Sequence, residues 1–182
     1  MTEQPATWLG LDADAKPLVV AGFALGVGIG GFFDGIVFHQ LLQFHHMLSS
    51  HPDASVATNL RLNVVADGLF HLGTYTFTII GLVLFSRAWR FRPVPKSGRT
   101  LFGAVIMGWG VFNLVEGVVN HHLLEIHHVW PAGPGPIVLW DVAFLLWGTV
   151  FLVGGYLTIR TDSAATPAGG TDAVATDGSG SE

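Results

Sequence analysis

The sequence predicts an all-α integral membrane protein whose four transmembrane helices form a bundle of two similar helical hairpins. Two observations carry this prediction: the composition is strongly apolar, and four apolar runs are each long enough to cross a bilayer. Half of the 182 residues are hydrophobic, the mean hydropathy is +0.52, and only 12% of the residues are charged. A soluble domain carries about 25% charged residues. The length suits a single domain.

The composition also excludes several classes of function. The chain has no cysteine, which rules out disulfides, thiolate metal sites and thiol nucleophiles within it. The eight Lys and Arg residues form no patch outside one short loop, so a nucleic-acid partner is not expected. The lipid bilayer is the expected partner, and a homo-oligomer or an unidentified membrane partner is left open.

The four apolar runs are expected to form spans of about 18–47, 60–86, 100–128 and 137–160, within a transmembrane domain of residues 18–160. About 20 apolar residues cover a hydrocarbon core of about 30 Å. The first run is too long for a signal peptide and lacks a basic segment before it. Within that run Gly22, Gly26 and Gly30 recur every four positions, a spacing that allows close packing against a neighbouring helix.

The positive charges predict the orientation of the spans. Seven of the eight basic residues fall before the first run, between the second and third runs, or after the fourth. The positive-inside rule places these segments in the cytoplasm of a cell-membrane protein. The N-terminal segment 1–17 and the tail 161–182 are then both cytoplasmic, and the small polar residues of the tail predict disorder. The loops 48–60 and 129–136 face outward.

A repeat with an offset of 82 residues is the most informative pattern in the sequence. The first copy contains Asp34, Gly35, His39, Leu41, Leu42, His45 and His46, and the second contains Glu116, Gly117, His121, Leu123, Leu124, His127 and His128. Asp67 and Asp141 each begin the second helix of a hairpin near its outer end. The pattern indicates two hairpins of the same topology, related by an axis along the membrane normal.

The segments GFFDGIVFHQLLQFHH, ADGLFH, FNLVEGVVNHHLLEIHH and WDVAFLLWG carry a resemblance to a known family. Over residues 18–160 the chain resembles the prokaryotic four-span predicted membrane proteins called domain of unknown function two-two-four-three. The resemblance implies a four-span membrane protein and implies no activity. The chemistry therefore has to be read from the residues.

The candidate functional residues gather near the outer side of the predicted membrane. At a rise of about 1.5 Å per residue from the cytoplasmic basic residues, Asp34, His71, Glu116 and Asp141 lie at about 24–29 Å and Asp67 at about 30 Å. His39 and His121 follow one turn higher. Straight helices would carry four more histidines to about 42–45 Å, as an exposed crown of outer candidates: His45, His46, His127 and His128.

Buried carboxylates at such a depth are costly and must be neutralised by protons, by pairing or by a cation. Arg61 alone cannot balance four of them. Mixed His and carboxylate ligands suit Fe, Mn or Zn, and a His-dominated site suits Cu or Zn. The predicted metal ligands are Asp34, His39, Asp67, His71, Glu116, His121 and Asp141. Asp67 and His71 share one helical face and make the best chelating pair, which Asn63 extends outward.

Four functions remain open from the sequence. The first is a metal-dependent protein, including a di-metal oxidoreductase, although the Glu-x-x-His motif of di-iron bundles is absent. The second is capture or transport of a metal ion. The third is a bis-histidine haem protein through His39 and His121, which the surrounding carboxylates disfavour. The fourth is a structural polar core, since one buried His is usually hydrogen-bonded and Asp141 can cap its helix.

Overall fold

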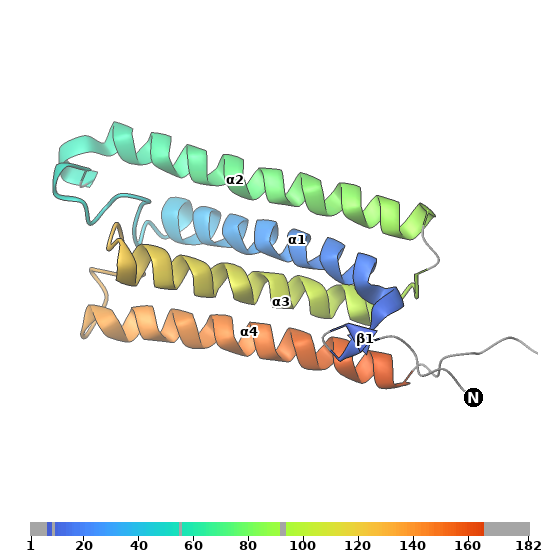
Figure 1. Cartoon of the computed structure of the whole chain (residues 1–182). Helices are drawn as coiled ribbons and strands as arrows, with labels where there is room; N and C mark the ends of the chain where they lie inside the picture. The colour runs from blue at the N-terminus through green and yellow to red at the C-terminus, as the bar shows by residue number, and fades with distance from the viewer. Residues whose placement is uncertain (1–6, 9, 55, 92–93, 166–182) are drawn as a thin grey trace, which may run out of the picture.

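The computed structural model describes residues 7–8, 10–54, 56–91 and 94–165. Four long helices run antiparallel to their chain neighbours (Figure 1), and all four are long and apolar enough to cross a membrane. This confirms the predicted all-α fold with four spans. The elements of the helical domain are α1 (Lys16–Phe33), η2 (Asp34–Leu41), η3 (Pro52–Ala54), α2 (Val56–Phe91), α3 (Gly98–Glu116), η4 (Gly117–Leu123) and α4 (Ile137–Ala165). Three short elements precede them: two antiparallel strands of two residues each, β1 (Thr7–Trp8) and β2 (Leu11–Asp12), and the short helix η1 (Ala13–Ala15).

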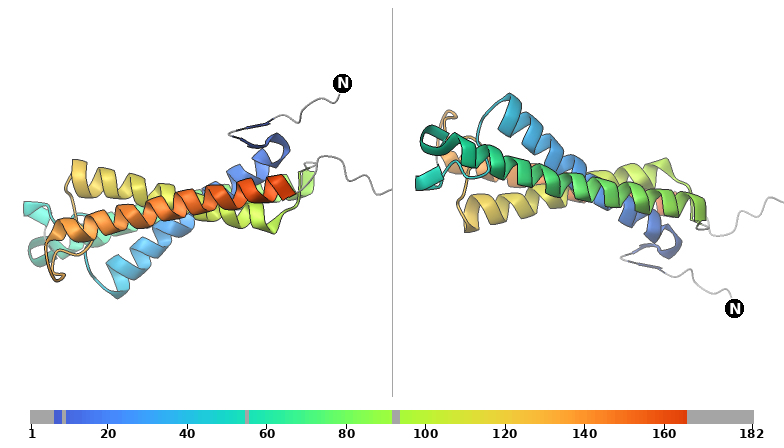
Figure 2. Two further views of the ribbon diagram at one scale, coloured as in Figure 1. Left: turned by 90° about the horizontal axis from the view of Figure 1, so that it is seen from below. Right: turned by 90° about the horizontal axis from the view of Figure 1, so that it is seen from above.

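The helices lie in the order α2, α1, α3, α4 (Figure 1). Helices α1 and α3 form the central pair and cross each other, as both views in Figure 2 show. Helix α2 packs on α1, and α4 packs on α3. The outer helices α2 and α4 expose many large apolar side chains, which a bilayer would cover.

Glycines permit the close approach of the two central helices. A Cβ atom on Gly26 would collide with the backbone of Val105 in α3, and one on Gly108 would collide with the backbone of Phe23 in α1. Gly22 faces Ala104, and Gly30 faces the ring of Trp109. The sequence stripe of glycines therefore packs against a neighbouring helix as expected.

Both central helices end in the same way at the same end of the molecule. Each widens into a π-helical segment, η2 after α1 and η4 after α3. The chain then reverses at a non-glycine residue with positive φ, Gln43 at 51° in one case and Glu125 at 48° in the other. Such residues are uncommon in the left-handed region. The reversal turns the following residues back toward the helix ends.

These turns change the span boundaries that the sequence predicted. The first and third spans were expected to continue to residues 47 and 128, whereas the helical segments end at Leu41 and Leu123. At the other end, α4 continues to Ala165, beyond the expected limit of 160. The remaining tail, for which disorder is predicted, lies outside the described residues from 166 onward.

The two ends of the domain differ in character. The start of α1, the segment between α2 and α3 and the end of α4 lie at one end (Figure 1), and this end carries most of the basic residues. There the Asp162 carboxylate accepts hydrogen bonds from the hydroxyls of Ser97 and Thr100, the latter at 2.6 Å, so α4 is tied to the start of α3. The connections between α1 and α2 and between α3 and α4 lie at the opposite end, beside the polar residues discussed next.

Candidate metal centre

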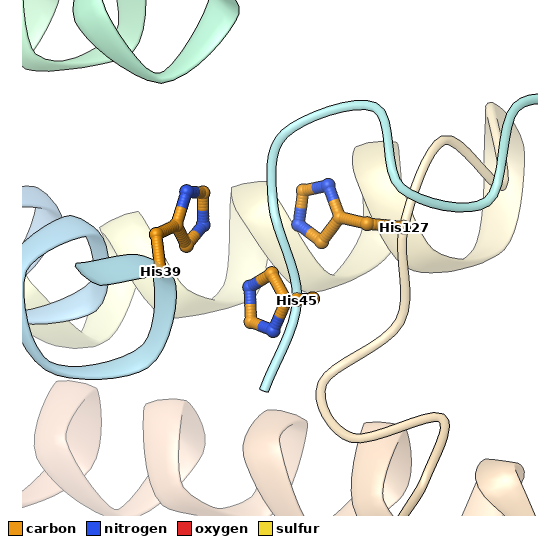
Figure 3. A group of neighbouring side chains, drawn as sticks. All are labelled: His39, His45 and His127. Carbon is orange, nitrogen blue, oxygen red and sulfur yellow. The ribbon is translucent and has the colours of Figure 1, made fainter. Parts of the chain in front are cut away.

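Four imidazoles from two hairpins meet in the interior at the end of the bundle away from the termini. His39 comes from η2, while His45 and His127 come from the two loops that turn back (Figure 3). His121 comes from η4. All four residues are at most 3% exposed. The rings of His45 and His127 stack with their centroids 4.6 Å apart, and the His39 and His121 rings flank that pair at 4.5 Å from His45 and 5.0 Å from His127.

Two carboxylates complete this inner cluster. Glu116 Oε1 lies 2.7 Å from His127 Nε2 and 3.0 Å from His121 Nε2. On the other hairpin, Asp34 Oδ2 lies 3.1 Å from His39 Nε2. Two sets of three side chains bring ligand atoms close enough together to hold a metal ion: His39 with His45 and His127, and Glu116 with His121 and His127.

The opposite nitrogen of each inner imidazole faces an acceptor. His45 Nδ1 donates to the Val129 carbonyl at 2.7 Å, and His127 Nδ1 donates to the Met47 carbonyl at 3.0 Å. A carbonyl oxygen only accepts, so both Nδ1 atoms carry the proton. In the neutral ring the Nε2 atom is then an unprotonated electron-pair donor.

Asp67 and Asp141 supply the acceptors for the other two rings. Asp67 Oδ1 lies 2.9 Å from His39 Nδ1, and Asp141 Oδ1 lies 3.5 Å from His121 Nδ1. Each of these carboxylates also accepts a backbone N–H from the returning loop, from Met47 at 2.9 Å and from Val129 at 3.0 Å. The predicted ligands Asp67 and Asp141 therefore stand behind the inner imidazoles and hold them in place.

Unsatisfied polar atoms concentrate in the inner cluster. Among the described residues, nine buried side-chain nitrogen and oxygen atoms have no hydrogen-bond partner, and seven belong to this cluster. Four of the seven still lie 3.0–3.5 Å from an ion-pair partner: Asp34 Oδ2, His39 Nε2 and both His121 nitrogens. The other three have neither kind of partner: Asp34 Oδ1, His45 Nε2 and Glu116 Oε2. Native proteins leave few such groups unpaired, because each costs about 1–3 kcal/mol. A bound cation would satisfy them.

Electrostatics keep His45 in the form that can bind a metal ion. Burial lowers the pKa of the His45 imidazole well below its ordinary value of 6.5, and nearby His127 and His39 lower it further. The hydrogen bond to the Val129 carbonyl opposes this change only in part. His45 is therefore neutral at pH 7, with a free electron pair on Nε2.

The structure corrects the prediction of an exposed histidine crown. His45, His46 and His127 are buried, with exposed fractions of 3%, 8% and 0%. The prediction was wrong because it extended straight helices past residues 41 and 123, where the chain reverses. His46 and His128 lie outside the inner cluster, and their Nδ1 atoms donate to Asp67 at 2.6 Å and to Asp141 at 2.8 Å.

The structure does not bring His71 into the inner cluster. Its Nδ1 donates to the carbonyl of Asp67 at 2.8 Å, one turn earlier in α2, and its ring packs against Gly35. The expected chelating pair of Asp67 and His71 is therefore not formed. Asn63, expected to extend that pair, instead accepts the Leu48 N–H at 3.0 Å and donates to the Ala54 carbonyl, so it fixes the loop before α2.

Sequence reasoning missed the backbone acceptors of the centre. The carbonyls of Met47 and Val129 orient His127 and His45 across the two hairpins. Neither residue type signals this role. The one sequence feature that could have indicated this role is the offset of 82 residues. It separates Met47 from Val129, as it separates His45 from His127, so the two hydrogen bonds correspond to each other.

The fold and this cluster define a class of protein: a membrane protein with four apolar helices and buried groups of His, Asp and Glu that could hold a metal ion. The chain belongs to the family described as Predicted membrane protein (DUF2243), whose model matches residues 21–162. No curated protein and no solved structure matches the chain.

Proposed function

We propose that the protein is a metal-dependent membrane oxidoreductase whose resident centre holds up to two transition-metal ions. The inner ligands are Asp34, His39, His45, Glu116, His121 and His127. The observation that carries the proposal is the orientation of His45 and His127. Their Nδ1 protons are held by backbone carbonyls, and their Nε2 atoms face other buried side chains that could also bind a metal ion. Metal-bound histidines almost always donate their second ring nitrogen in this way.

The ligand inventory supports Cu, Fe, Mn or Zn. Four imidazoles and two carboxylates offer the nitrogen and oxygen ligands these ions prefer, and the absence of cysteine excludes thiolate coordination by this chain. Both ligand sets contain His127, whose Nδ1 is held by the Met47 carbonyl and whose single free nitrogen can bind only one ion. Two ions would therefore divide the ligands, with Glu116, His121 and His127 on one ion and Asp34, His39 and His45 on the other. When bound, a redox-active ion supplies the electron acceptor or donor, and this chain supplies the ligand geometry and the low-polarity surroundings.

A second copy of one hairpin explains why the centre has matching halves. The proposed duplication is supported by contacts that recur in both halves: His39 to Asp67 matches His121 to Asp141, and His45 to Val129 matches His127 to Met47. The axis that relates the halves would pass between α1 and α3. A site built on that axis receives each type of ligand twice.

A stack of aromatic rings lies between His45 and the loop before α4. The Phe38 ring lies 6.3 Å from His45 and 5.9 Å from Phe44, and Phe44 stacks on Trp130 at 4.3 Å. Trp130 is the one ring of this stack that can itself be oxidised, and the two phenylalanines only pack the space between it and the centre.

The inner half of the bundle gives no support to a transport path. The hydroxyls of Thr74, Thr76, Thr78 and Thr158 each donate to a carbonyl of their own helix at 2.8–2.9 Å. Glycine contacts close the interface between α1 and α3 below the cluster. Haem also fits poorly, because the four imidazole rings pack against one another and leave no slot for a porphyrin.

Elemental analysis of the purified full chain tests the proposal. After stripping with a chelator and dialysis against each of Cu, Zn, Fe and Mn, the protein is expected to retain one or two ions of a redox-active metal per chain. His45→Ala and His127→Ala are expected to lose that metal. His51→Ala is the matched control, because His51 is exposed and lies outside both ligand sets.

The outcomes separate the alternatives. A folded wild-type protein that retains no metal under any of these conditions would leave the structural polar core as the explanation. Retention of zinc alone, with no absorption or paramagnetic signal that changes on reduction, would contradict the redox role and keep the metal site. Equal metal content in His45→Ala and His51→Ala would show that His45 is not a ligand and would contradict the proposed ligand set.

A further inference from the structure

An apolar groove leads from the lipid-facing side of α1, α2 and α3 to the proposed metal centre. It has a volume of about 410 Å³, which is within the range of small-molecule sites. Four phenylalanines line it: Phe23, Phe70, Phe77 and Phe112. A neighbouring chamber of about 230 Å³ shares Phe70, Phe77 and Phe112 with it and extends to Gly73.

Glu116 is the single carboxylate among the residues that line this groove. Its Oε1 atom faces His121 and His127, whereas its Oε2 atom is buried and has no hydrogen-bond partner. Glu116 lines the groove, so a small rotation of its side chain would present the unpaired oxygen to a hydroxyl group in the groove. A hydrocarbon chain could not satisfy that oxygen. Asn120 adds an amide among the lining residues.

Tryptophans occupy the equivalent positions of the other hairpin. Trp109 stands 82 positions after Val27, and Trp147 stands 74 positions after Gly73, the offset that also relates Asp67 to Asp141. The rings of Trp109 and Trp147 lie 6.1 Å apart and pack on Phe33 at 5.1 and 5.7 Å. A separate hollow of about 220 Å³ on that side is lined by Trp147 and has no carboxylate among its lining residues. Val27 lines the groove and the chamber, and Gly73 lines the chamber, so these two small residues leave space where the other half has tryptophan.

We infer that this groove binds a membrane-soluble phenol of the hydroquinone class, with its ring among the phenylalanines and a hydroxyl donating to Glu116. The inference rests on the proposed function, since it assigns a substrate class to the same centre. Aromatic side chains favour a planar ring at 4.5–7 Å between centroids. The acceptor on Glu116 favours a ligand that carries a hydroxyl over a lipid acyl chain.

Saturable binding of decylhydroquinone to the metal-loaded protein in nanodiscs tests the inference. We expect one site per chain for the wild type. The dimethyl ether of the same compound cannot donate a hydrogen bond and should bind about ten- to a hundredfold more weakly, because hydrogen bonds to charged groups contribute about 1.5–3 kcal/mol. Equal binding of the two compounds would overturn the inference.

Variants with tryptophan in the first hairpin, at the positions equivalent to Trp109 and Trp147, provide a second test of the inference. Val27→Trp and Gly73→Trp place tryptophan where the other half already has one, and a Cβ atom on Gly73 meets no other atom within 4 Å. Both are expected to abolish saturable binding and to keep the wild-type metal content. Gly68→Trp is the matched control on the same helix, because Gly68 also has open space and, unlike Gly73, lines neither the groove nor the chamber.

Metal content separates failure of this inference from failure of the proposed function. Metal-loaded wild type that shows only non-saturable partitioning of decylhydroquinone would mean that lipid fills the groove, and the metal centre would stand. Undiminished saturable binding in Gly73→Trp would place the ligand elsewhere. Loss of metal in every protein, wild type included, would instead refute the centre itself.

Discussion

At the scale of single residues, Asp67 shows why a carboxylate near the proposed metal centre need not be a ligand. Its two oxygens face His39 Nδ1 at 2.9 Å and His46 Nδ1 at 2.6 Å, and one of them also accepts the Met47 N–H. These contacts fix the tautomer of His39 and the path of the returning loop. Asp67 would thus hold His39 Nε2 ready for the proposed metal ion without being a ligand itself.

Replacement of Asp67 should weaken metal binding without removing a ligand. For Asp67→Asn we expect about a 10- to 100-fold loss of metal affinity, the usual effect of changing the partner of a metal-bound histidine. Competition with a chelator measures the affinity. His71→Ala is the control in the same helix, because the hydrogen bond of the His71 ring goes to the backbone carbonyl of Asp67 and not to a side chain of the inner cluster. Similar affinities in Asp67→Asn and the wild type would contradict the positioning role.

At the scale of elements, the crossing of α1 and α3 determines how closely the ligands approach. Gly26 and Gly108 each contact the backbone of the opposite helix. In a membrane such contacts between small residues supply much of the association between helices, since lipid is as apolar as the side chains. The two π-helical ends carry His39 and His121, and the loops that follow them bring His45 and His127 to backbone carbonyls of the opposite hairpin.

A larger side chain at the crossing should destabilise the whole bundle. Gly26→Leu is expected to lower the free energy of unfolding by about 1–3 kcal/mol or more, as overpacking does in tight cores. Unfolding by sodium dodecyl sulfate in mixed micelles measures the change. Gly68→Leu introduces the same side chain into open space and should remain close to the wild type. Equal stability of the two variants would show that the crossing is not tightly packed.

The sequence predicted the helices well and the loops poorly, for a physical reason. Apolar runs and basic residues report directly on which segments cross a bilayer, so four spans were evident. The reversals at Gln43 and Glu125 occur at residues that seldom adopt positive φ, and no glycine marks them. His45 and His127 were therefore placed outside, although the 82-residue offset had already paired them with each other.

At the scale of the whole molecule, the polar centre and the basic residues lie at opposite ends of the four helices. The positive-inside rule assigns the basic end to the cytoplasm. The loops between α1 and α2 and between α3 and α4 would then face the outer side of the membrane. Both chain ends would then be cytoplasmic. The account predicts that the metal is acquired from the outer side, because His46 and His128 lie between the inner cluster and the surface.

Labelling of single cysteines tests this orientation without background, because the chain has no native cysteine. Ser50→Cys in the outer loop should react with a membrane-impermeant maleimide in intact cells. Gly98→Cys, at the start of α3, should react only after the membrane is permeabilised. Both positions are exposed in the structure. The reverse labelling pattern would place the metal centre on the cytoplasmic side.

The central claim is that four imidazoles bind metal through Nε2 inside the bundle. X-ray absorption at the edge of the retained metal tests it most directly. The account predicts a first shell of nitrogen and oxygen at about 2.0–2.2 Å, outer-shell scattering from several imidazole rings, and loss of part of that scattering in His45→Ala. A shell of oxygen atoms without imidazole scattering, unchanged in His45→Ala, would contradict the account.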